Sequence, residues 1–84
     1  MSYEIFIKKS AEKELEAIPA KIHDKMIQHM LALGNNPRPK LSKKLHAREG
    51  YRLRIGKYRI LYLINDKEKK IEIISVALRK DAYH

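Results

Sequence analysis

The sequence contains no cysteine, so the chain can build neither a disulfide framework nor a cysteine-rich zinc site. Its four histidines are scattered, without the spacing of metal ligands. The motifs GxxxxGK(S/T), GxGxxG, HExxH and GxSxG are missing too, which leaves the nucleotide, zinc and serine-nucleophile chemistry of these motifs unsupported. We therefore expect a protein that uses no metal and no cofactor.

Long apolar runs are also absent. The longest, at residues 60–64, is too short to span a membrane, and the N-terminus lacks the basic and apolar regions of a signal peptide. These features predict a soluble, cytoplasmic protein. At 84 residues, the chain is expected to form a single domain, residues 1–84, with a small core.

Positive charge is what the sequence has in excess, with 19 basic and 10 acidic residues and a formal net charge of +9. Nearly all of the excess lies in residues 38–59, which hold nine basic side chains and one acid, Glu49. The segments 1–37 and 60–84 have net charges of zero and +1. This concentration predicts a polyanionic partner, and the alternative is a solvated basic surface without a partner.

Two segments have the pattern of helices. The first is expected at residues 11–18, with Ser10 as its N-cap, and it ends before Pro19. The second runs from Ala20 to Leu33, where apolar residues recur at helical spacing and a Gly-Asn-Asn-Pro stop follows. Its methionines are expected in the core.

Four segments are predicted to be strands: residues 3–8, 51–55, 58–65 and 71–77. Residues 35–49 are expected to form a loop. The order is then β-α-α-β-β-β, an α+β fold. A helical hairpin would cover one face of a four-stranded, mainly antiparallel twisted sheet and leave the other face partly open.

Four arginines are expected to converge on the open face. Because side chains alternate along the strand at 51–55, Arg52 and Arg54 point away from the core. Arg59 follows on the next strand, and Arg79 follows the last strand and can approach the same face. Such a group of guanidiniums can bind a phosphate bidentately and stabilise the charge of a phosphoryl transition state.

Three stretches resemble the RelE/ParE toxin superfamily: residues 51–55 (YRLRI), 56–62 (GKYRILY) and 74–83 (ISVALRKDAY). The likeness extends over essentially the whole chain. Resemblance to RelE implies the toxin of a type II toxin–antitoxin system, a metal-independent endoribonuclease that cuts messenger RNA in the ribosomal A site. In that reaction the RNA's own 2′-OH attacks the adjacent phosphate. The resemblance also implies a cognate antitoxin from an adjacent gene, and we expect it to bind through an acidic, amphipathic segment.

By this resemblance, Arg59 corresponds to a phosphate-binding arginine and Arg79 to a transition-state arginine. Tyr83 corresponds to a C-terminal tyrosine that stacks on or orients the nucleotide; from its spacing alone it could equally pack on the sheet. The basic segment then supplies expected contacts to RNA and the ribosome: Arg38, Lys40, Lys43, Lys44, Arg48 and Lys57.

One departure from the family concerns the general base. Arg52 and Arg54 stand where RelE-type toxins often carry lysines, and because arginine stays protonated we expect them to neutralise charge. The base is left open between His46, Glu49, Tyr83 and none of these.

Two other interpretations remain. A ParE-type toxin has the same fold but poisons DNA gyrase by binding it, and an inactive relic would only bind RNA or antitoxin. Arg79, Tyr83 and the basic set favour the ribonuclease, since a gyrase-binding protein has no chemical reason to hold them.

Overall fold

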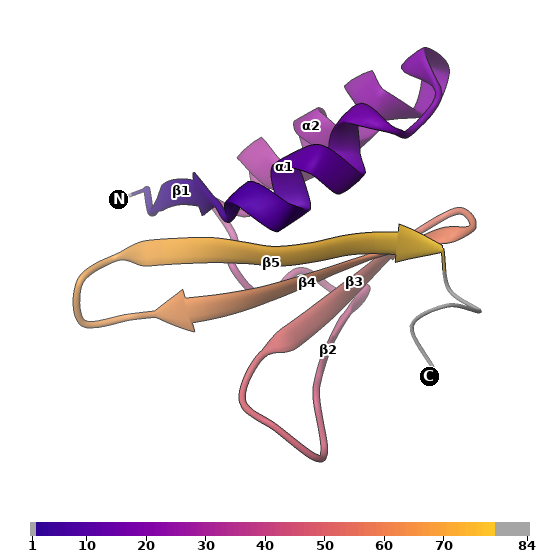
Figure 1. Ribbon diagram of the computed structural model, residues 1–84. Helices are drawn as coiled ribbons and strands as arrows, with labels where there is room; N and C mark the ends of the chain where they lie inside the picture. The colour runs from indigo at the N-terminus through magenta and orange to yellow at the C-terminus, as the bar shows by residue number, and fades with distance from the viewer. Residues whose placement is uncertain (1, 79–84) are drawn as a thin grey trace.

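The computed structural model describes residues 2–78, in which two helices lie on one side of a sheet (Figure 1). The elements in chain order are β1 (Glu4–Ile7), α1 (Lys9–Glu16), α2 (Ala20–Ala32), β2 (Ser42–Lys44), β3 (Tyr51–Ile55), β4 (Tyr58–Asn65) and β5 (Lys70–Leu78). The predicted α+β class, with a helical hairpin covering one face, is confirmed. We call the sheet face away from α1 and α2 the open face.

The sheet has five strands in the order β1-β5-β4-β3-β2, one more than predicted. β1 pairs with β5 in parallel, and the other three pairs are antiparallel. The additional strand, β2, lies in the segment that was predicted to be a loop. Ser42, Lys43 and Lys44 show no apolar alternation, so only their pairing with β3 reveals the strand. Two lysines suit this edge position, because charged side chains discourage further strand pairing.

The prediction that Ser10 caps the first helix is wrong. α1 begins at Lys9, and Lys8 occupies the N-cap position without a side-chain hydrogen bond. The backbone N–H of Lys8 donates to the Ile73 carbonyl at 3.0 Å, and the Lys8 carbonyl accepts from the Glu12 N–H at 2.9 Å. Lys8 extends the pairing of β1 with β5 and is also the N-cap of α1. The geometry of the sheet therefore decides where the helix begins.

The core lies between the helices and the sheet. α1 contributes Ala11 and Leu15, and α2 contributes Met26 and Met30, all buried, so the core role predicted for methionine is confirmed. From the sheet come Leu53, Ile55, Ile60, Tyr62, Ile71, Ile73 and Val76. Among the described residues, no helix is long and apolar enough to cross a membrane.

A β-bulge interrupts the pairing of β4 with β5. Leu61 lies opposite Ser75 and Tyr62 opposite Ile73, so Ile74 is the inserted residue. β1 pairs with β5 only as far as Ile73, and beyond that point α1 supplies the missing partner. The Glu14 carboxylate accepts hydrogen bonds from the Ser75 hydroxyl at 3.2 Å and from the Val76 N–H at 3.0 Å. Glu14 therefore closes the edge of β5 at the bulge.

A second polar cluster ties the loop after α2 to the turn after β4. The Arg38 guanidinium donates to both carboxylate oxygens of Asp66, at 2.8 and 3.3 Å, and to the Tyr51 hydroxyl at 3.0 Å. The Tyr3 hydroxyl donates to Asp66 at 2.6 Å. Arg38, and secondarily Tyr3, hold the pKa of Asp66 at about 2, below its usual value. The hydrogen bond to Asp66, and secondarily the one to Tyr51, raises the pKa of Arg38 above that of an ordinary arginine.

We expect Glu14→Ala to lower the free energy of unfolding by about 1–3 kcal/mol, because it leaves two part-buried donors without their acceptor. Glu14→Gln keeps an acceptor oxygen and should cost less. Urea unfolding measures both, with Glu12→Ala on the exposed side of α1 as the control. Equal losses for Glu14→Ala and Glu12→Ala would contradict this account of β5.

We expect acid to destabilise the fold through Asp66. Since the pKa of Asp66 is lower in the folded chain, its contribution is complete above about pH 4 and is lost as the pH falls toward about 2. Thermal melting across this pH range tests it. Asp66→Asn should flatten the pH dependence of the melting temperature, and an unchanged dependence would exclude Asp66 as its cause.

Candidate functional site

Two arginines lie directly opposite each other on the open face. In the antiparallel pairing of β3 with β4, Arg54 is the partner of Arg59, and Arg52 points to the same face two residues along β3. Side chains so paired have Cβ atoms roughly 5 Å apart, and like charges in this position repel. This confirms the predicted side for Arg52 and Arg54 and adds their register with Arg59.

The arginines differ in depth. Among the described residues, Arg59 is a buried charged residue, with 5% of its surface exposed. Arg52 and Arg54 are half-buried. Burying a guanidinium at this depth costs free energy of desolvation, which burying an apolar side chain would not. Its charge also acts through surroundings of lower effective dielectric constant, so it is felt more strongly by an anion nearby. On its other side, Arg59 lies opposite the small Ala77 of β5.

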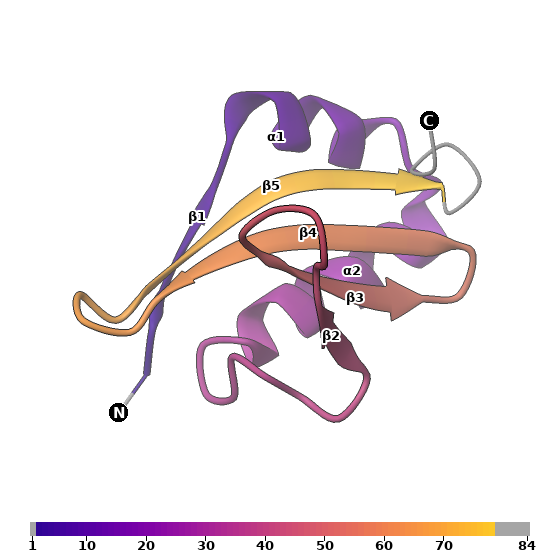
Figure 2. The same cartoon turned by 90° about the horizontal axis from the view of Figure 1, so that it is seen from below.

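Two of the other predicted cations join this group. Lys43 lies opposite Arg52 across the β2–β3 pair, and its side chain is exposed. Lys57 lies in the turn that connects β3 to β4, separated from the Arg54–Arg59 pair by one further pair of residues. We call Lys43, Arg52, Arg54, Lys57 and Arg59 the arginine end of the open face, which Figure 2 views from the side opposite the helices.

The remaining predicted RNA contacts are placed elsewhere. Arg38 is held by Asp66 and Tyr51. Lys44 pairs opposite Tyr51, the neighbour of Arg52, so its side chain points to the face opposite that of Arg52. Lys40 lines a small hollow on the helix side together with Leu41. Arg48 is exposed in the loop between β2 and β3. Their contacts with RNA stay predictions.

Two of the candidate bases lie in the same loop. His46 and Glu49 are exposed, and Glu49 lines a hollow next to Leu63. Leu63 is four residues beyond Arg59 on β4, roughly 13 Å along the strand. Glu49 therefore lies away from the Arg54–Arg59 row, and no contact within residues 2–78 links His46 to that row. Arg79 and Tyr83 lie outside the described residues, so their proposed roles stay predictions.

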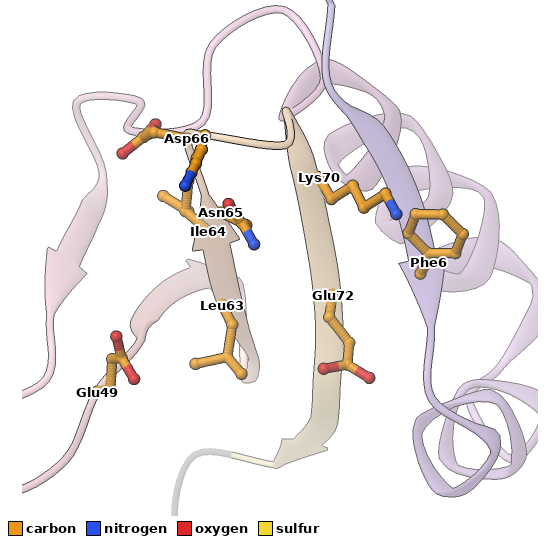
Figure 3. Close-up of a pocket in the computed structure, with 9 residues that line it drawn as sticks. Phe6, Glu49, Leu63, Ile64, Asn65, Asp66, Lys70 and Glu72 are labelled. Carbon is orange, nitrogen blue, oxygen red and sulfur yellow. The ribbon is translucent and has the colours of Figure 1, made fainter.

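The hollow occupies the other end of the open face and has a volume of about 760 Å³. Figure 3 shows Phe6 from β1, Glu72 and Lys70 from β5, and Leu63 from β4 around it. The loop reaches it because Gly50, with a positive φ of 128°, packs against β4: a Cβ there would lie 3.2 Å from the Tyr62 carbonyl oxygen. Sequence reasoning missed this hollow, since no local pattern links its segments.

A metal-binding group is not found in the described part of the chain: residues 2–78 bring no three His, Asp or Glu side chains together. Burial raises the pKa of the Tyr62 phenol, which donates to the Pro37 carbonyl at 2.8 Å and has a structural role.

Known proteins similar to this chain are toxins. Residues 5–83 match the family described as the ParE toxin of the type II toxin–antitoxin system parDE. Toxin RelE of Mycobacterium tuberculosis is 34% identical, over 96% of this chain and 86% of that protein.

Solved structures agree in fold. The toxin in the archaeal RelE–RelB complex of Pyrococcus horikoshii superposes with a TM-score of 0.84 at 29% identity, over 94% of this chain and 97% of that chain. In the RelBE2 toxin–antitoxin complex of M. tuberculosis, the TM-score is 0.82 at 26% identity, over 94% of this chain and 100% of that chain. The chain therefore belongs to the ParE toxin family of type II toxin–antitoxin systems, within the RelE/ParE superfamily.

Proposed function

We propose that this toxin is a metal-independent, ribosome-dependent endoribonuclease that cleaves messenger RNA in the A site. The observation that carries the proposal is the placement of Arg54 opposite Arg59 on the open face, with Arg52 beside them. The identity to Toxin RelE supports it.

The arginine pair suits a phosphate in both geometry and charge. Two guanidiniums from adjacent strands can each donate to the nonbridging oxygens of one phosphate. Binding becomes stronger as negative charge grows on those oxygens in the transition state, and this difference lowers the barrier. Lys43 and Lys57 extend the positive surface toward the flanking RNA backbone.

The reaction needs no group from outside the RNA to form its new bond. The 2′-oxygen attacks the adjacent phosphorus, the bond from phosphorus to the 5′-oxygen breaks, and the products are a 2′,3′-cyclic phosphate and a 5′-OH. A base takes the 2′-OH proton, and an acid returns one to the 5′-oxygen. We assign the stabilisation of negative charge to Arg52, Arg54, Arg59 and Arg79. We assign to Tyr83 the role of stacking on or orienting the nucleotide. The group that transfers the proton stays open between His46, Glu49, Tyr83 and none of these.

We propose that a cognate antitoxin binds this toxin, as RelB binds RelE in the complexes from M. tuberculosis and P. horikoshii. The charge of residues 38–59 favours an acidic segment over the arginine end, where it would compete with RNA.

A second candidate is a ParE-like toxin that binds and poisons DNA gyrase, because the family that residues 5–83 match is the ParE toxin family. It requires no reaction at the arginines. Assays of message cleavage and of gyrase-dependent DNA breakage separate the two functions.

Expression of the toxin should stop growth and truncate translated messages, and Arg54→Ala should slow cleavage by roughly 10²–10³-fold, as expected for loss of one transition-state donor. Primer extension on a message under translation measures this. Lys25→Ala, which removes an exposed charge from α2, is the matched control and should cut normally. Arg59→Lys adds a variant that keeps the buried charge but loses the planar fork.

Circular dichroism melting shows whether each variant is folded before its rate is interpreted. Full cleavage by folded Arg54→Ala and Arg59→Lys would remove the arginine pair from the mechanism. Intact messages together with gyrase-dependent DNA breaks would establish the ParE-like function instead.

A further inference from the structure

The open face carries charge of opposite sign at its two ends. Strand register places Phe6, Glu72 and Leu63 in one row across β1, β5 and β4, and Glu4, Lys70 and Asn65 in the next row. The neighbouring row, in which Leu61 pairs with Arg52 and Arg52 with Lys43, already belongs to the arginine end. With Glu49, Asp66 and Lys67, which also line the hollow, this second end holds four carboxylates and two ammonium groups.

The carboxylates at the hollow are available to a partner. Lys70 lies 3.5 Å from Glu68 and 5.6 Å from the centre of the Phe6 ring, and Asp66 is paired with Arg38. Within residues 2–78, neither Glu49 nor Glu72 forms an ion pair. Figure 3 shows their carboxylates on either side of Leu63.

Apolar side chains lie on both sides of Glu72 in this row: Phe6 on β1, and Leu63 on β4 between the two carboxylates. Phe6 is 45% exposed on edge strand β1, although a phenylalanine on a sheet normally buries more of its ring. Leu63 is half-buried beside it across β5. The hollow thus offers an apolar contact flanked by two carboxylates.

This chemistry disfavours RNA as the occupant. A phosphate backbone that follows the arginine end would meet Glu72 and Glu49 at the hollow, and like charges there repel it. A polypeptide can instead vary in charge along its length. It can place acidic residues on the arginine end and an apolar and a basic residue at the hollow.

We propose that the Phe6–Leu63 hollow is an anchor for the antitoxin, which inserts an apolar side chain next to a lysine or arginine that pairs with Glu72 and Glu49. This rests on the antitoxin partner of the proposed function. The anchor lies next to the arginine end and gives the antitoxin a contact whose carboxylates disfavour a phosphate backbone.

The test uses the toxin purified with its co-expressed antitoxin from the adjacent gene, then separated and refolded. Glu72→Lys should raise the Kd for antitoxin on the order of tenfold, through lost attraction and added repulsion. Phe6→Thr should raise it by a similar factor, through lost apolar contact. Glu16→Lys, on the exposed side of α1, makes the same charge change away from the sheet and should leave the Kd unchanged.

Messenger RNA cleavage by Glu72→Lys should equal that of the wild-type toxin, since Glu72 is not in the arginine end. In the antitoxin, reversing the basic residue to glutamate should restore affinity for Glu72→Lys. An unchanged Kd in folded Glu72→Lys and Phe6→Thr overturns the anchor. A gain in RNA affinity by Glu72→Lys beyond that of Glu16→Lys, without loss of antitoxin affinity, would assign the hollow to RNA. A wild-type toxin that cuts no message would overturn the ribonuclease function alone, because the antitoxin measurements need no RNA.

Discussion

The pairing of β4 with both of its neighbours is the constraint on which the core and the site depend. Alternation sends Ile60 and Tyr62 of β4 to the helices and Arg59 and Leu63 to the open face. A slip of one residue would turn Arg59 into the core and expose the isoleucine. The same apolar contacts that stabilise the fold therefore fix the register that sets Arg59 opposite Arg54.

That register is kept by polar contacts at both ends of the sheet. At the bulge in β5, Glu14 replaces the strand that β1 no longer provides, so the segment opposite Arg59 is held by α1. At the other end, Arg38 and Asp66 bind the loop after α2 to the turn after β4. Arg38 thus has a structural role, although its charge alone suggested an RNA contact.

Local patterns were sufficient to predict some features and not others. Alternation at 51–55 correctly placed Arg52 and Arg54 on the open face, and helical spacing correctly placed the methionines. Ser10 failed as an N-cap because the sheet bond of Lys8 sets the helix start. The strand at Ser42–Lys44, the Glu14 contacts and the hollow depend on pairing between distant segments, which no single stretch of sequence specifies.

The central claim is that Arg54 and Arg59 bind the phosphate at which the RNA is cut. It is tested most directly by a structure of the toxin on a translating ribosome, with a message whose attacking 2′-OH is replaced by a methoxy group. The account predicts the scissile phosphate within about 3 Å of donor nitrogens from both arginines. A bound message whose scissile phosphate contacts neither arginine would contradict it.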